Sequence, residues 1–174
     1  MTKALVVFES MFGNTELIAQ AVAEGLRASM PVEVTEVMDA PADPPADISL
    51  IVAGGPTEAF SMSRTRTRTE AVRQGGRPGR EEFGLRDWLA GLPSRDTNTK
   101  LATFDTKFAK MRQLAGSAAK GAAKAGRHHG FNLAVPPESF FVHDTAGPLA
   151  DGELGRARAW GQRLGYLVNS SENR

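Results

Sequence analysis

The chain has 174 residues and a mass of 18.6 kDa, with 41% hydrophobic residues, 24% charged residues and no cysteine. This composition is typical of one globular domain over residues 1–174 and argues against a disordered or fibrous protein. Without cysteine there is no disulfide, thiolate metal site or thiol catalysis, so a redox function would need a bound cofactor. The opening apolar run, Ala4 to Phe8, is too short for a signal peptide or a membrane span. We therefore expect a cytoplasmic protein with no membrane insertion.

The charges are distributed unevenly along the chain. Residues 1–60 carry a net charge of −7, residues 61–129 carry +9 and residues 130–174 carry −1. The basic block is densest at Arg64-Thr-Arg66-Thr-Arg68 and between Lys107 and His129. Two interpretations stay open: surfaces that face water, or a patch that binds an acidic partner or a phosphorylated ligand. The adjacent His128 and His129 cannot face one metal from a regular helix, and we predict no metal site.

Strands and helices alternate along the first third of the chain. A continuous apolar run over residues 3–9 predicts a strand buried on both faces, and helical spacing from Thr15 predicts a helix that Asn14 or Thr15 could cap. Strict alternation over 32–38 is typical of an edge strand. A third strand is predicted over 48–53, followed by a loop that begins at Gly54-Gly55-Pro56.

The rest of the chain continues this alternation. We predict a short helix near 70–74, helices over 81–92, 116–127 and 150–168, a short fourth strand over 99–104, and two strand pieces over 130–135 and 139–143 separated by Pro136-Pro137. Such βαβ units predict an α/β fold, a three-layer doubly wound sheet of five parallel strands in the order 2-1-3-4-5. Ligands of such sheets bind at the carboxyl ends of the first and third strands.

The turn between the first strand and the first helix reads Glu9-Ser10-Met11-Phe12-Gly13-Asn14-Thr15-Glu16. A phosphate there would meet backbone N–H groups and the positive end of the helix dipole, with the Ser10 and Thr15 hydroxyls as further donors. The turn lacks the Gly-Lys-Ser/Thr of a Walker A loop and the three spaced glycines of a dinucleotide fingerprint, which disfavours nucleoside triphosphates and NAD. The alternative is a turn that only caps the helix.

This turn resembles the phosphate loop of flavodoxins, usually written Thr/Ser-x-Thr/Ser-Gly-x-Thr. The resemblance covers nearly the whole chain: Gly54-Gly55-Pro56-Thr57 and Thr103-Phe-Asp-Thr106 stand where flavodoxins place their two flavin loops, and residues 139–165 resemble their last strand and helix.

The resemblance implies a flavodoxin-like electron-transfer protein that binds FMN without a covalent bond. Ser10, Gly13, Asn14 and Thr15, with the backbone of Met11 and Phe12, would hold the phosphate. The segment from Pro56 through Thr57 to Phe60 would lie along one side of the flavin ring. Asp105, Thr106 and Phe108 would lie along the other side and offer backbone groups to it. Phe60 or Phe108 could stack on the ring.

Two other functions stay open. An FMN-dependent NAD(P)H reductase of the quinone type could bind the phosphate of NADPH through Arg64, Arg66 and Arg68. A flavin-free binding module could use the basic face, and Phe12, which replaces a hydroxyl of the motif, is the best argument for it. We expect a redox partner protein with an acidic surface. Nucleic acid is not an expected partner, because the basic stretch lacks interleaved aromatic residues and a helix-turn-helix pattern.

Overall fold

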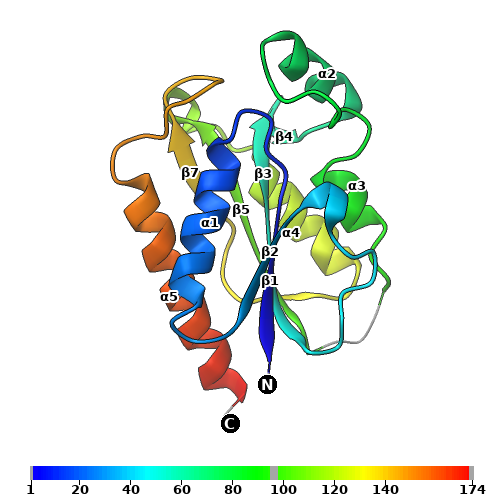
Figure 1. Ribbon diagram of the computed structural model, residues 1–174, viewed down its shortest axis with the longest axis vertical. Coiled ribbons are helices and arrows are strands. Elements are labelled where there is room, and N and C mark those ends of the chain that lie inside the picture. Colours follow the sequence, from blue (N-terminus) through cyan, green and yellow to red (C-terminus); the bar gives the residue numbers. More distant parts are fainter. Residues whose placement is uncertain (1, 95–97, 173–174) are drawn as a thin grey trace.

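A parallel β-sheet runs through the middle of the molecule, with helices on both sides (Figure 1). The computed structural model describes residues 2–94 and 98–172. The strands β1 (Lys3–Phe8), β3 (Ile48–Glu58) and β5 (Lys100–Phe108) are central, and β2 (Val32–Glu36) forms one edge. The apolar runs of β1 and β3 are buried on both faces, as expected of central parallel strands.

The other edge of the sheet is divided between two short strands. Both β6 (Asn132–Leu133) and β7 (Glu138–Val142) pair in parallel with β5, and Pro136-Pro137 lies between them. Since proline cannot donate a backbone hydrogen bond, it separates the two pairings. The resulting order, β2-β1-β3-β5 followed by β6 and β7, confirms the predicted 2-1-3-4-5 arrangement.

The helices α1 (Asn14–Leu26) and α5 (Glu153–Glu172) cover one face of the sheet, and α3 (Leu85–Ala90) and α4 (Ala118–His128) cover the other (Figure 1). On the first face Phe104, Phe140 and Trp160 pack edge to face, with ring centroids 5.9 to 6.2 Å apart. No helix within the described ranges is long and apolar enough to cross a membrane.

Two strands extend further than the sequence predicts. The third predicted strand is β3, which runs to Glu58, and the fourth is β5, which runs to Phe108. The residues from Pro56 to Glu58 and from Asp105 to Phe108 therefore lie in strands, not in the loops that we expected. The reason is continued pairing. Pro56 stands opposite Thr106, and β7 pairs with the last five residues of β5. Gly54 lies so close to the Phe104 ring that an added Cβ would be 2.0 Å from it, which explains the glycine without a turn.

The helices also differ from their predicted bounds. The helix expected near 70–74 is α2 (Thr65–Arg73), preceded by β4 (Ser61–Met62), which pairs with the end of β3. The helix predicted over 81–92 is shortened to α3. Short 3-10 turns, η1 (Val37–Asp39) and η2 (Ala109–Met111), follow β2 and β5. Figure 1 shows α2 beyond the carboxyl ends of the strands, away from the sheet faces.

The position of α2 depends on Arg68, whose side chain is only 1% exposed. Its guanidinium donates hydrogen bonds to Ser63 Oγ at 2.9 Å, to the Glu81 carbonyl at 2.7 Å and to Asp87 Oδ2 at 3.2 Å, and lies 3.9 Å from Glu9 Oε1. Arg68 is therefore not a member of a water-facing basic run, as the sequence suggested.

Removing this guanidinium should be costly because it leaves the Glu9 carboxyl buried without its cation. We expect Arg68→Ala to lower the free energy of unfolding by about 3–5 kcal/mol in urea denaturation. Arg66→Ala, on the exposed side of the same helix, should change it by no more than about 0.5 kcal/mol. The pair Glu9→Gln with Arg68→Met should recover part of the loss. Equal effects of Arg68→Ala and Arg66→Ala would contradict the role given to the buried pair.

Candidate functional site

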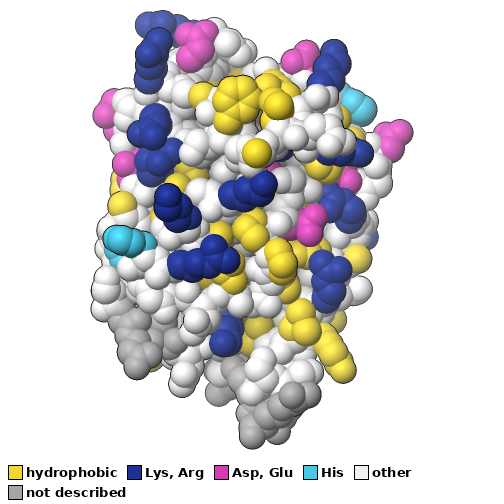
Figure 2. Space-filling model, turned by 180° about the vertical axis from the view of Figure 1, so that it is seen from behind, with side chains coloured by type: hydrophobic (Ala, Val, Ile, Leu, Met, Phe, Trp, Pro, Cys, Tyr) yellow, Lys and Arg dark blue, Asp and Glu magenta, His cyan; other side chains and the backbone are white. Residues whose placement is uncertain are grey.

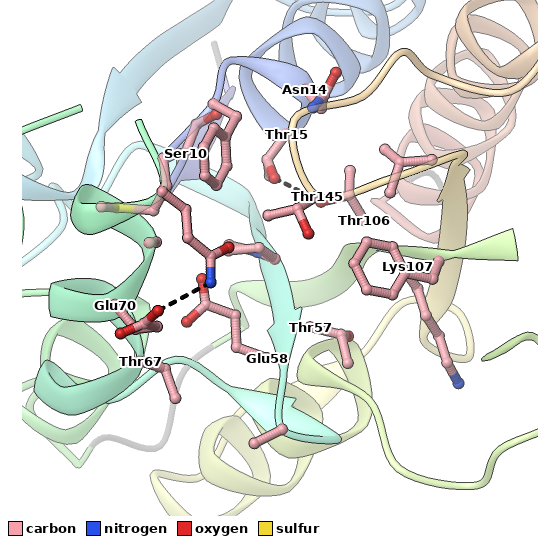
Figure 3. A pocket seen from close by; sticks show the side chains of 18 of the residues that line it. Ser10, Asn14, Thr15, Thr57, Glu58, Thr67, Glu70, Thr106, Lys107 and Thr145 are labelled. Atoms are coloured by element: carbon pink, nitrogen blue, oxygen red, sulfur yellow. Dashed lines mark hydrogen bonds between the residues drawn. The ribbon is translucent and has the colours of Figure 1, made fainter. Parts of the chain in front are cut away.

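A cavity of about 320 Å³ opens at the carboxyl ends of β1, β3 and β5 (Figure 3). Its volume lies at the lower end of the range of about 300–1,000 Å³ seen for small-molecule pockets. Its walls come from the turn before α1, the end of β3 and the turn after it, one side of α2, and the end of β5. This is the edge of the sheet at which ligands of doubly wound folds bind.

Most of the predicted site residues line this cavity, although they are up to 98 positions apart in the chain. The lining includes Ser10, Met11, Phe12, Asn14, Thr15, Pro56, Thr57, Phe60, Thr106 and Phe108. Gly13 and Asp105 do not line it. The parallel sheet brings these segments together because the carboxyl ends of its strands share one edge.

The turn before α1 leaves several backbone donors free. Gly13 has a φ of 96°, in the left-handed region, and its N–H donates to Ser10 Oγ at 3.0 Å. Gly13 also precedes the helix as its N-cap without a side-chain bond, so the expected capping by Asn14 or Thr15 is wrong. In the part of the chain that the structure describes, no acceptor is bonded to the N–H groups of Met11, Phe12, Asn14, Thr15 and Glu16. Free N–H groups at a helix N-terminus form an anion-binding site.

A hydrogen bond joins this turn to the opposite wall. The hydroxyls of Thr15 and Thr106 lie 2.7 Å apart and both residues are buried (Figure 3). Ser10 is buried as well. Three hydroxyl groups, from Ser10 in the turn, Thr15 in the first turn of α1 and Thr106 on β5, thus line this end of the cavity and can reorient toward an anion.

The hairpin turn at Ala59 and Phe60 forms one lip of the cavity. Glu58 pairs with Ser61, and the two residues between them have φ values of 47° and 64°, as in a type I′ turn. Such a backbone is unfavourable for most residues other than glycine, and neither Ala59 nor Phe60 is a residue type that predicts it. Gly116 packs against the Phe60 carbonyl, because a Cβ added to Gly116 would lie only 2.4 Å from that oxygen. The Phe60 side chain is 53% exposed at the cavity mouth.

Six polar residues of the lining were not named in the predicted site: Glu58, Thr67, Glu70, Gln74, Lys107 and Thr145. Thr67 and Glu70 lie on the side of α2 that faces the cavity, and Glu58 ends β3 (Figure 3). Gln74, the residue that follows α2, also lines the cavity. Gln74 donates to Glu70 at 3.1 Å. The spacing of residues 67, 70 and 74 is that of one helix face, which would have identified them had α2 been predicted at its full length.

The lining contains two carboxyl groups, those of Glu58 and Glu70, and the Glu58 group is in the less usual environment. Its Oε2 atom is buried and has no hydrogen-bond partner among the described residues. Burial raises the pKa of the Glu58 carboxyl, and the nearby Thr67 hydroxyl opposes this effect. A buried acceptor without a partner, aimed into a cavity, indicates a ligand that brings a donor.

Asp105 does not line the cavity, whereas Lys107 lines it but directs its ammonium group to the backbone. Asp105 is paired within the sheet to Gly55 of β3 and to Ser139 of β7. Its Oδ2 accepts from the Ala119 N–H at 3.0 Å, while Oδ1 is buried with no partner among the described residues. Lys107 Nζ donates to the Leu114 carbonyl at 2.6 Å. No cluster of three or more His, Asp or Glu side chains that could hold a metal occurs in the described ranges.

Comparisons with known proteins agree on the fold. No family model matches the sequence, and no curated protein matches it either. Among solved structures, a flavodoxin from the domain Archaea has 20% sequence identity and a TM-score of 0.67, with 97% of this chain and 99% of that chain covered. Oxidised Flavodoxin 2 from Bacillus cereus has 20% identity and a TM-score of 0.63, with 98% and 99% covered.

A third match is part of a longer protein. The flavodiiron core from Synechocystis has 15% identity and a TM-score of 0.64, and the alignment covers 98% of this chain and 36% of that one. At these identities the similarity establishes the architecture. The chain has the flavodoxin-like fold.

The stability of the protein should depend on pH through Asp105. Burial raises the pKa of its carboxyl above the value of 3.8 that an exposed aspartate has. The native state therefore holds this proton more tightly than the unfolded chain. The cost of ionisation is absent below pH 3.8 and grows as the pH rises toward the native pKa. In thermal unfolding, Asp105→Asn should match the wild type near pH 4 and exceed it near pH 8.

The exposed Asp151 provides the control for this prediction, because Asp151→Asn should give a difference from the wild type that does not change with pH. A constant difference for Asp105→Asn across the same range would show that its carboxyl is not the titrating group.

Proposed function

We propose that this chain, as a single domain, binds FMN without a covalent bond and works as an electron-transfer protein. The observation that carries the proposal is the set of five free N–H groups at the start of α1, which opens into a cavity with aromatic side chains at its other side. Bound FMN would supply one- and two-electron chemistry, which the side chains of a protein without cysteine do not provide.

The phosphate of FMN would bind at the turn before α1. The backbone N–H groups of residues 11, 12 and 14–16 and the Ser10 hydroxyl would be its donors, with the dipole of α1 favouring negative charge. Among the described residues, Lys107 is the one Lys or Arg in the lining, and its ammonium group donates to the Leu114 carbonyl. Recognition of the anion would thus rely on neutral donors, which favours a phosphate held close to the backbone.

The ring of the flavin would occupy the remainder of the cavity. Phe60 and Phe108 offer aromatic surfaces there, and each stacked aromatic contributes about 1–3 kcal/mol. Glu58 Oε2, which lacks a partner among the described residues, would find one in the polar edge of the ring, which carries both an N–H donor and carbonyl acceptors. The cavity therefore fits a ligand that is anionic at one end and both aromatic and polar at the other.

The reductase alternative is weakened by the position of one arginine. Arg64, Arg66 and Arg68 were expected to bind the phosphate of NADPH together, but Arg68 is buried and bonded to Ser63 and Asp87. Arg64 and Arg66 remain exposed. Adding NADPH to the FMN-loaded protein without oxygen separates the two functions, because the flavin of a carrier should stay oxidised and that of a reductase should bleach.

The phosphate site should make the affinity for FMN much higher than that for riboflavin. Titration of the apoprotein, followed by flavin fluorescence, should give a micromolar or lower Kd for FMN and a Kd at least about 100-fold higher for riboflavin. Ser10→Ala should weaken FMN binding about 10- to 150-fold, because a hydrogen bond to a charged group is lost, and leave riboflavin unchanged. Ser170→Ala on α5 is the matched control. Equal affinities for FMN and riboflavin would refute the phosphate site.

A hydroxyl at position 12 should strengthen the same site. Phe12 lines the cavity at the turn and offers no side-chain donor. Phe12→Thr should lower the Kd for FMN about tenfold, with the riboflavin Kd changed much less, in the same fluorescence titration. The exposed Phe83 serves as control, since Phe83→Thr should leave both constants unchanged. Weaker binding of FMN by Phe12→Thr would mean that Phe12 contacts the ligand itself.

A further inference from the structure

One segment of the chain carries basic residues without acidic ones. Residues 106–137 contain six Lys or Arg and no Asp or Glu. Lys110, Lys120, Lys124 and Arg127 are exposed, and within the described ranges none of them forms an ion pair. We call the three of them that lie on α4, Lys120, Lys124 and Arg127, the α4 basic surface. Figure 2 shows the molecule from behind, where Lys and Arg side chains predominate over the middle and a group of hydrophobic side chains lies near the top.

The packing of α4 directs its cations outward. Ala118, Ala119, Ala122, Ala123 and Gly126 are buried against the sheet, and a Cβ on Gly126 would lie 2.1 Å from Leu101. Lys120, Lys124 and Arg127 are spaced as one face of the helix, opposite these small residues. The helix therefore presents a row of positive charges about 10 Å long.

This row begins at the mouth of the cavity. Gly116, just before α4, packs against the Phe60 carbonyl, and Gly121 packs against Ser61 and Met62 of β4. Lys120 lies on the turn of α4 between these two glycines, and its ammonium group donates to the Ala115 carbonyl at 2.8 Å. The half-exposed Phe60 ring and the α4 basic surface are thus neighbours.

We propose that Phe60 and the α4 basic surface dock an acidic electron-transfer protein. The proposal rests on the proposed function, since the partner would exchange electrons with FMN in the cavity beside Phe60. An exposed aromatic residue beside charged residues is the usual anatomy of a protein interface, in which the aromatic contributes affinity and the charges steer the encounter. The surface differs from the site first suggested at Arg64, Arg66 and Arg68, because Arg68 is inaccessible.

Among the residues that the structure describes, the opposite side of the molecule carries no such surface. On α1 and α5, Arg158 pairs with Glu24 at 3.1 Å, and Arg156 pairs with Glu138 and Glu153. Charges of both signs are mixed there and cancel at a distance. A nucleic acid is disfavoured as the occupant because one aromatic ring provides no platform for successive bases.

The test compares two charge reversals of equal size. Lys120→Glu with Lys124→Glu changes the α4 basic surface, and Arg27→Glu with Arg163→Glu changes exposed positions at the end of α1 and on α5. Each pair alters the net charge by the same amount. Both glutamates would lie in the first two turns of α4. A negative charge at position 120, in the first turn, interacts favourably with the helix dipole. Lys120→Gln with Lys124→Gln is a milder second variant.

The probe is a reduced, acidic plant-type [2Fe–2S] ferredoxin, and stopped-flow absorbance measures the rate at which it reduces the FMN-loaded protein. For the wild type, the rate should fall with rising ionic strength. The α4 glutamate pair should slow the reaction about tenfold or more at low salt and reverse the salt dependence, with the glutamine pair intermediate. The control pair should change the rate less than about threefold.

Two further measurements separate this proposal from the proposed function. The FMN titration decides whether the flavin binds, and its Kd should be the same for all variants. Calorimetric titration of the apoprotein with oxidised ferredoxin needs no flavin and should show weaker binding for the α4 pair alone. Equal slowing by both pairs, or an unchanged rate for the α4 pair, would overturn the docking surface. Tighter binding of a 30-nucleotide single strand than of ferredoxin would overturn the choice of partner.

Discussion

The arrangement of the site depends on one buried cation. Arg68 lies between the end of β1, where Glu9 accepts hydrogen bonds from Ser63 and from the Leu85 N–H, and α3, where Asp87 accepts from the guanidinium. A buried guanidinium must satisfy its donors, because the cost of removing it from water is several kcal/mol. The protein satisfies them only by holding α2 over the ends of the strands. The cavity has a wall on that side because this charge is paired.

A second set of contacts, made by Arg77, attaches the chain that follows α2 to the turn before α1. The Arg77 N–H donates to the Met11 carbonyl at 2.8 Å, and its guanidinium pairs with Glu16 at 2.6 Å. Glu16 lies in the first turn of α1, where its charge would oppose an incoming anion. The pairing with Arg77 reduces that repulsion and also fixes the turn from outside. The free N–H groups are therefore held in place before any ligand arrives, which lowers the entropy cost of binding.

The architecture could be predicted from hydrophobic patterns because each central strand is apolar throughout and each main helix has one apolar face. The ends of β3 and β5 could not be predicted in this way. The sequence Gly54-Gly55-Pro56 is locally typical of a turn, and it is extended because it pairs with β5. Arg68 was misread for a related reason. It lies in an alternation of Arg and Thr that carries no apolar signal, so its burial depends on Glu9, which is 59 residues away. The motif indicated the turn that lines one side of the cavity, but the wall formed by α2 could be identified only from the tertiary structure.

Negative charge is favourable at one end of the cavity and unfavourable at the other. The N–H groups at α1 favour an anion, whereas Glu58 and Glu70 at the other end already supply carboxyl groups. Burial has raised the pKa of the Glu58 carboxyl, and any further negative charge brought into the cavity would raise it again, because like charges favour the neutral form. A ligand that becomes more negative beside Glu58 would therefore draw a proton to this carboxyl. Charge in the cavity and protonation of Glu58 are coupled by their proximity, and the coupling weakens as Glu58 gains access to water.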